Sequence, residues 1–213
     1  FDNGSGSLGG NVGLGFFYSC TSLKRVNWGA GLKTIGRIAF LNCSALETVE
    51  IPDTVTEIGD HAFCGCAGLV NVKTGAKVTK IGRGAFRALP NLTGVSFGPV
   101  LTDIGKEAFR DCVNLQNFTL PASIQYLRYA CFAGCSKALT TVTIPTNEGE
   151  LTTEFEQAVF SGCTKLEEVT LGDTVKAIPG VAISGTSYSY GNGEYFDNGS
   201  GSLGGNVGLG FFY

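Results

Sequence analysis

Apolar residues recur along this chain with a period of 23 residues, and a phenylalanine marks each period. These phenylalanines are Phe17, Phe40, Phe63, Phe86, Phe109 and Phe132. The same register continues to Phe160, Ile183 and Phe212, at spacings of 28, 23 and 29 residues. A repeat of this length predicts a stack of similar coils, because one coil cannot bury its apolar face without neighbours.

Within one period the apolar positions predict a short strand. Val49 and Ile51 alternate with polar residues, which is typical of a strand with one buried face, and Pro52 ends it. The next apolar residue is followed by glycine, as in Ile58-Gly59, and a glycine that takes positive φ predicts a corner there. The segment Ala62–Cys66 is too short for an ordinary helix, so we expect a helical or 3₁₀ turn.

A longer repeat encloses the short one. Residues Phe1–Tyr18 recur unchanged as Phe196–Tyr213, at an offset of 195 residues. Eight turns of the short period span the same 195 residues, so the two periods are in phase. We therefore expect one solenoid domain over residues 1–213, with about eight coils of 23–29 residues. The sequence reads as one 195-residue unit plus an overlap, cut from a tandem array in which Ser-Cys follows Tyr213.

The repeated residues resemble a known family. The Leu-Val-Ile-Pro, Val-Ile-Gly and Ala-Phe-Gly-Cys pattern, over about Phe16 to Ile183, is similar to the BspA-type, or Treponema-type, leucine-rich repeat. Cysteine is absent where expected at Leu89 and Thr186. Glycine is absent at the positions Arg128, Glu156 and Pro179. The resemblance implies a surface or secreted protein that binds other macromolecules or hosts.

Composition excludes several classes of protein. The net charge is −3 and the charges are scattered singly, which disfavours a nucleic-acid surface or an anionic-membrane patch. No apolar run is long enough for a membrane span, and the sequence contains no Met and no signal peptide. We expect a mature or internal piece of an extracellular or cell-surface protein.

The eight cysteines follow the repeat. One repeat position holds Cys20, Cys43, Cys66, Cys112, Cys135 and Cys163. This periodicity predicts a ladder of buried thiols, since free Cys packs like a small apolar residue. Cys131 replaces the alanine of the repeat and is expected to be buried. Cys64 lies outside the ladder and is the best candidate for a disulfide or a reactive thiol.

Asparagine in Asn-x-Ser/Thr sequences suggests glycosylation. The candidates are Asn3, Asn42, Asn91, Asn117 and Asn198. Together they favour a glycosylated, secreted protein. The alternative is that asparagine occurs at bends because it tolerates their backbone geometry.

Candidate catalytic and cofactor motifs are weak. Gly4–Gly9 matches the spacing of a dinucleotide-binding loop, but no strand precedes it and no helix follows. His61 is the single histidine and is expected on the surface, which leaves no histidine-based triad or multi-histidine metal site. Cys64 and Cys66 lack the spacing of a zinc or redox motif. We expect no enzyme activity, no cofactor and no metal.

Two surfaces remain as candidates for binding. Outward positions on successive strands form a mixed polar column of Asn27, Glu50, Lys73, Ser96, Thr119, Thr143 and Thr170. An enlarged Gly-rich turn, 184–209, carries four aromatic residues that are candidate assembly contacts: Tyr188, Tyr190, Tyr195 and Phe196. Each has a neutral alternative, a solvated face in the first case and a flexible loop in the second.

Two functions follow from these observations. The favoured one is a structural protein whose identical units extend the solenoid into an extracellular filament or tubule, with the protein itself as the partner. The alternative is a surface adhesion or recognition module that uses the polar column. Its partners would be glycans or host surface proteins.

Overall fold

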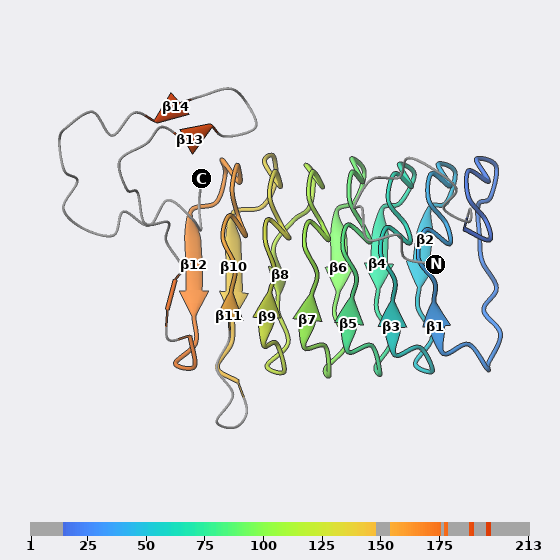
Figure 1. The fold of residues 1–213 in the computed structure, drawn as a ribbon, viewed down its shortest axis with the longest axis horizontal. Helices are drawn as coiled ribbons and strands as arrows, with labels where there is room; N and C mark the ends of the chain where they lie inside the picture. Colours follow the sequence, from blue (N-terminus) through green and yellow to red (C-terminus); the bar gives the residue numbers. More distant parts are fainter. Residues whose placement is uncertain (1–14, 148–153, 176, 179–187, 190–194, 197–213) are drawn as a thin grey trace.

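The chain forms a solenoid whose coils stack along one axis (Figure 1). The computed structural model describes residues 15–147, 154–175, 177–178, 188–189 and 195–196. Each complete coil contributes one short strand to each of two rows, and a single apolar core lies between the rows. The prediction of a leucine-rich repeat solenoid with short parallel strands is confirmed.

The first row is a six-stranded parallel sheet in the order β1-β3-β5-β7-β9-β11. Its strands are β1 (Thr34–Ile35), β3 (Glu57–Ile58), β5 (Lys80–Ile81), β7 (Asp103–Ile104), β9 (Tyr126–Leu127) and β11 (Glu154–Phe155). The register pairs equivalent residues, for example Ile35 with Ile58 and Ile58 with Ile81. The period of the sequence therefore sets which residues of neighbouring strands pair with one another.

The second row consists of two three-stranded parallel sheets, β2-β4-β6 and β12-β10-β8. Their strands are β2 (Thr48–Glu50), β4 (Asn71–Lys73), β6 (Gly94–Ser96), β8 (Phe118–Thr119), β10 (Thr141–Ile144) and β12 (Glu168–Leu171). The amide of Gln116 donates to the carbonyl of Thr93 at 3.0 Å, which connects the two sheets. A separate antiparallel pair joins β13 (Tyr188–Ser189) to β14 (Tyr195–Phe196).

The core is built around a column of stacked phenylalanine rings. Their centroids lie 5.0 to 5.6 Å apart from one coil to the next. The column contains Phe17, Phe40, Phe63, Phe86, Phe109, Phe132 and Phe160. Phe63 to Phe160 are fully buried, whereas the first ring, Phe17, is 37% exposed. Neighbouring coils therefore supply the burial that no coil achieves by itself.

The expected helical or 3₁₀ turns are isolated hydrogen-bonded turns instead, and no helix occurs within the described residues. Around Phe63 the amides alternate between two kinds of acceptor. Ala62 donates to Gly59 within its coil, Phe63 donates to Ala85 of the next coil, and Cys64 donates again within its coil. A helix needs consecutive amides to bond within one segment, so bonding between coils interrupts it.

The prediction that the Ile-Gly pairs turn the corner with positive φ is wrong. Positive φ occurs two residues before and two residues after the phenylalanines, as at His61 and Gly65 around Phe63. The glycine of the Ile-Gly pair allows close approach instead. A Cβ on Gly59 would lie 2.7 Å from the backbone nitrogen of Arg37 in the preceding coil.

The described residues contain about six complete turns rather than eight. The two further turns expected at Ile183 and Phe212 lie outside the described residues, as does the return of the long repeat into phase. None of the described segments forms a helix that is long and apolar enough to cross a lipid bilayer.

Candidate functional site

The predicted polar column lies on the outer face of the second row of strands. We call it the polar ladder: Asn27, Glu50, Lys73, Ser96, Thr119, Thr143 and Thr170. Strand pairing places Lys73 between Glu50 and Ser96. Thr143 lies between Thr119 and Thr170. All members are exposed except Thr143, which is half-buried. The predicted outward orientation is confirmed.

A second exposed column runs beside the polar ladder, two residues earlier in each strand. Thr48 pairs with Asn71, which pairs with Gly94. Asn117 continues this column, and its Oδ1 accepts the amides of Thr140 and Thr141 at 2.8 and 2.9 Å. A groove of about 430 Å³ lies along both columns from β2 to Asn117. The face is therefore a regular polar surface on a rigid sheet.

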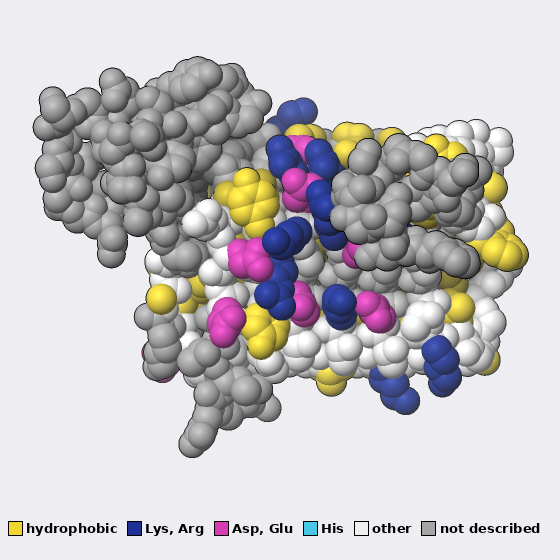
Figure 2. Space-filling view, viewed as in Figure 1, with side chains coloured by type: hydrophobic (Ala, Val, Ile, Leu, Met, Phe, Trp, Pro, Cys, Tyr) yellow, Lys and Arg dark blue, Asp and Glu magenta, His cyan; other side chains and the backbone are white. Residues whose placement is uncertain are grey.

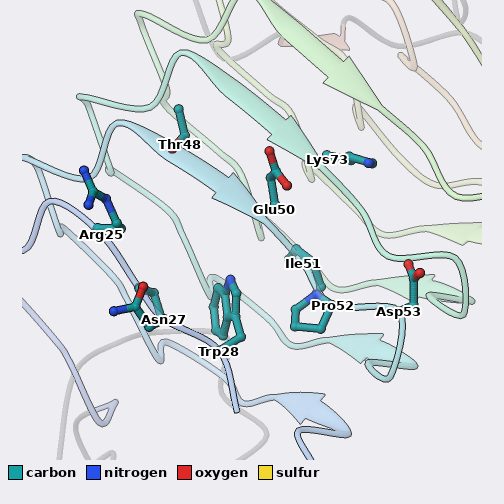
Figure 3. Close-up of a pocket in the computed structure, with 10 residues that line it drawn as sticks. Arg25, Asn27, Trp28, Thr48, Glu50, Ile51, Pro52, Asp53 and Lys73 are labelled. Carbon is teal, nitrogen blue, oxygen red and sulfur yellow. The ribbon is translucent and has the colours of Figure 1, made fainter. Parts of the chain in front are cut away.

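A larger hollow of about 610 Å³ lies at the end of this face nearest the first coil (Figure 3). Its lining comes from the segment Arg25–Trp28, from β2 and residues 51–53 that follow it, and from β4. The lining residues include Arg25, Asn27, Trp28, Glu50, Pro52, Asp53 and Lys73. Only the polar-ladder members of this set were proposed from the sequence as part of a binding surface. Arg25, Trp28, Pro52 and Asp53 were missed, although Trp28 is the single tryptophan of the chain.

The charges around the hollow are balanced. Arg25 and Lys73 contribute two positive charges, and Glu50 and Asp53 contribute two negative ones. One oxygen of Asp53 is occupied, because its Oδ1 accepts the amide of Ala76 at 2.7 Å. Within the described part of the chain, Arg25, Asn27, Glu50 and Lys73 make no ion pair or side-chain hydrogen bond. Their polar groups are therefore available to a ligand.

The first row of strands has a different surface, a band of paired charges (Figure 2). Glu107 contacts Arg87 at 2.8 Å and Arg110 at 3.0 Å. Arg128 bonds Asp103 at 2.9 Å and Glu156 at 3.4 Å. These pairs are partly exposed, so each contributes little stability. Because the charges neutralise one another between coils, this face is less suited to a charged partner.

Arg128 and Glu156 occupy positions where the repeat expects glycine. The Arg128 guanidinium lies 4.3 Å from the centroid of the Tyr126 ring. Hydrogen bonding to Asp103 is the main cause that raises the pKa of Arg128. Thus the missing glycines are replaced by side chains that pair across adjacent coils.

Five of the six cysteines at the repeated position are buried as predicted, whereas Cys20 in the first coil is exposed. Each buried thiol donates to the carbonyl oxygen of a phenylalanine one coil earlier. The pairs are Cys43 with Phe17 (3.1 Å), Cys66 with Phe40 (3.0 Å), Cys112 with Phe86 (3.1 Å), Cys135 with Phe109 (3.6 Å) and Cys163 with Phe132 (3.3 Å). Burial raises the pKa of Cys66 and of Cys112 to about 12.

The remaining candidates for thiol and histidine chemistry are Cys131, Cys64 and His61, and all three are at least half-buried. Cys131 is buried as predicted, and all eight cysteines are unpaired. Burial raises the pKa of Cys64, which argues against a reactive thiol. His61 is half-buried rather than freely exposed, and burial is the main cause that lowers its pKa. A Cβ on Gly84 would lie 2.6 Å from the His61 ring, so that glycine accommodates the imidazole.

The glycosylation candidates fall in different environments. Asn42 is exposed and has a φ of 61°. Asn91 is exposed, and its Nδ2 donates to the carbonyl of Ala67 at 2.9 Å. Asn117 is exposed but its amide is bonded to Thr140 and Thr141. Asn3 and Asn198 lie outside the described residues.

The aromatic assembly candidates are only partly described. Tyr188 and Phe196 pair across the antiparallel strands β13 and β14, and Tyr195 lies in β14. Tyr190 lies outside the described residues. The structure therefore brings three of the four onto one hairpin-like pair of strands.

Comparison with known proteins agrees with this architecture. The model of the BspA type leucine rich repeat region matches six copies, over residues 10–138 and 89–192. The crystal structure of a leucine-rich repeat protein from T. pallidum is similar, with 34% sequence identity and a TM-score of 0.64, over 70% of this chain and 68% of that one.

Two more distant structures share the fold. A leucine-rich repeat protein from Bacteroides ovatus has 23% identity and a TM-score of 0.54, over 75% of this chain and 57% of that one. The pneumococcal vaccine antigen PcpA has 22% identity and a TM-score of 0.51, over 74% of this chain and 47% of its own. No curated protein sequence matches the chain significantly. The repeat pattern, the stacked coils and the family match together show that the chain belongs to the BspA-type leucine-rich repeat family.

Proposed function

We propose that this chain is a surface recognition module that binds a macromolecular partner along the polar ladder. The observation that carries the proposal is the continuity of that face. Equivalent polar side chains on successive strands stand at a fixed register, with a groove and a hollow alongside. Such a surface presents many hydrogen-bonding groups in a preorganised arrangement, which reduces the entropy lost on binding.

The core beneath this face supports preorganisation. Val49 and Val72, between the outward residues of β2 and β4, are almost completely buried. The backbone of the two strands is paired in register from Thr48 to Glu50. The exposed side chains therefore project from a packed sheet rather than from a loop.

An extracellular or cell-surface location is part of the proposal. Members of the BspA-type family are mostly surface or secreted proteins that bind macromolecules, and the exposed sequons at Asn42, Asn91 and Asn117 suit such a setting. Peptide mass spectrometry of native material should find hexose-containing mass on at least one of Asn3, Asn42, Asn91 and Asn117. Unmodified asparagine at all four would argue for an intracellular location.

Binding of the labelled protein to cultured epithelial cells and to immobilised extracellular-matrix proteins tests the recognition function. Lys73→Glu and Thr119→Arg change the polar ladder without touching the core, and binding should fall at least tenfold in each. Lys33→Glu is the matched control, because Lys33 is an exposed lysine directly before β1 on the other row of strands and, like Lys73, makes no ion pair among the described residues. Equal loss in all three variants, or none in the ladder variants, would contradict the proposal.

A second candidate function is the array unit of a filament. The segment Gly15–Cys20 stacks on the next coil: the Phe17 amide donates to Ala39 at 2.7 Å, and the Phe17 and Phe40 rings lie 5.0 Å apart. Phe16 in this segment is 90% exposed. Residues Gly15–Tyr18 of this segment recur at 210–213.

Head-to-tail stacking of such parallel coils extends into a filament when the rotation between units does not close into a ring. Eight turns at about 4.8 Å per strand give an axial repeat of roughly 38 Å. Electron micrographs of native material test this candidate. Dispersed monomers of one unit's mass, without a periodic filament, would eliminate it and leave the recognition module.

A further inference from the structure

The hollow beside Trp28 brings an aromatic ring together with unengaged polar groups. Figure 3 shows Trp28 beside Asn27 and Pro52, with Glu50 on the adjoining strand. Among the described residues, no side-chain hydrogen bond occupies Asn27, Glu50 or the indole N–H of Trp28. The volume of about 610 Å³ lies within the range of small-ligand sites.

Trp28 owes its accessibility to its place in the repeat. By register it corresponds to Ile51, which is almost fully buried. In the first coil the same position is only half-buried. The ring packs edge-on against Phe40, with centroids 5.7 Å apart and planes at 80°. Packing therefore fixes the indole while part of it still lines the hollow.

We infer that this hollow binds a neutral sugar, as one or more pyranose rings of a glycan chain. The negative face of an aromatic ring attracts the C–H groups on one face of a pyranose. Carboxylate oxygens of Glu50 accept hydrogen bonds from sugar hydroxyls, and the amide of Asn27 both donates and accepts. Pro52 adds an apolar side to the same hollow.

The balance of charge selects a neutral ligand. Arg25 and Lys73 offset Glu50 and Asp53, so an anionic or cationic sugar would meet a like charge with no net attraction to compensate.

This inference rests on the proposed recognition function and names a ligand class for one end of the same face. Trp28 is the single tryptophan, so its fluorescence reports directly on the hollow. Titration with trimers of glucose, mannose and N-acetylglucosamine should give a saturable change in emission with at least one of them. A heparin hexasaccharide, the charged comparison, should give none.

Variants of the hollow separate binding from folding. The double variant Asn27→Ala with Glu50→Gln changes exposed side chains and keeps the reporter, and it should bind about tenfold more weakly or worse. Thr119→Arg, on the same face outside the hollow, should bind sugar normally. Calorimetry should show that Trp28→Phe retains most of the affinity and Trp28→Ala loses it, with thermal melts confirming that both fold.

No saturable change with any neutral trimer, binding of heparin alone, or unchanged affinity in the double variant would overturn the sugar assignment. Competition distinguishes this failure from failure of the proposed function. If cell binding needs Lys73 and Thr119 but free sugar neither binds nor competes, the recognition face stands and the sugar site does not. If cell binding ignores the polar ladder, the recognition function itself fails.

Discussion

The Sγ atom of Cys66 lies 3.0 Å from the carbonyl oxygen of Phe40, one coil earlier in the solenoid. The same oxygen accepts the amide of Cys43 at 3.2 Å within its own coil. A carbonyl has two lone pairs, so both bonds are compatible. The repeated cysteines therefore make thiol hydrogen bonds between coils, in addition to the apolar packing that their periodicity predicts.

Alkaline pH should destabilise the fold through these thiols. The pKa of Cys66 is raised from 9.0 to about 12 by burial. In the unfolded chain the thiol ionises above pH 9, while the folded chain retains the proton. Stability is therefore complete below pH 9 and falls as pH rises from 9 towards 12, by about 1 kcal/mol per pH unit for each such thiol.

Denaturant unfolding of the wild type and of Cys66→Ala between pH 7 and 11 tests this linkage. The variant should be less stable at pH 7, because it leaves a small void and loses the bond to Phe40, but its stability should fall less steeply above pH 9. Identical slopes would show that Cys66 does not titrate as a buried group.

Removal of a central phenylalanine should be far more costly than removal of the first one. Phe86 is fully buried between Phe63 and Phe109. Phe86→Ala should lower the free energy of unfolding by about 3–5 kcal/mol. Phe17→Ala, at the open end of the column, should have a smaller effect, and Lys73→Ala very little. Equal losses at Phe86 and Lys73 would mean that the buried and exposed faces are assigned wrongly.

Replacing the glycine of an Ile-Gly pair by alanine should change stability differently in different pairs. A Cβ on Gly82 would lie 2.6 Å from the backbone nitrogen of Asp60, whereas a Cβ on Gly36 would meet nothing within 4 Å. Gly82→Ala should therefore lower stability by about 1–3 kcal/mol through overpacking. Gly36→Ala should be neutral or slightly stabilising. Thermal melts of the two variants side by side would show whether close approach, rather than flexibility, explains these glycines.

Glycine should stabilise the chain at a left-handed position that now holds alanine. Ala88 is exposed and has a φ of 57°. Ala88→Gly should raise the free energy of unfolding by up to about 1 kcal/mol, because glycine adopts this conformation without the Cβ clash. Ala76→Gly is the matched control at an exposed position without positive φ, and it should destabilise by about 0.5–1 kcal/mol. A loss of stability in both variants would contradict this reading of the backbone.

Much of the fold could be predicted because the same pattern of apolar residues recurs in successive coils. The apolar alternation at Val49 and Ile51 recurs in most coils, and the structure places both residues in the core. The polar ladder follows from the same alternation, since the residue between two inward positions must face outward. A strand position assigned wrongly in one coil would have been out of register with the equivalent positions in the other coils.

The positions of the bends were harder to predict because they depend on hydrogen bonds between coils. His61 and Gly65 both take positive φ, yet one is histidine and the other glycine, so residue type does not identify the position. What the two share is the direction of their amides, which donate to Arg83 and Arg87 of the next coil. That requirement arises only when the coils are stacked.

The sequence by itself determined the coil period, the buried register and the outward polar ladder, because each depends on spacing along the chain. Only the tertiary structure decided where the glycines permit close approach, how Arg128 pairs with Asp103, and that Trp28 lines a hollow with Glu50 and Lys73. These features join residues about one or two coils apart. Their geometry depends on how neighbouring coils pack, which a pattern within one coil does not specify.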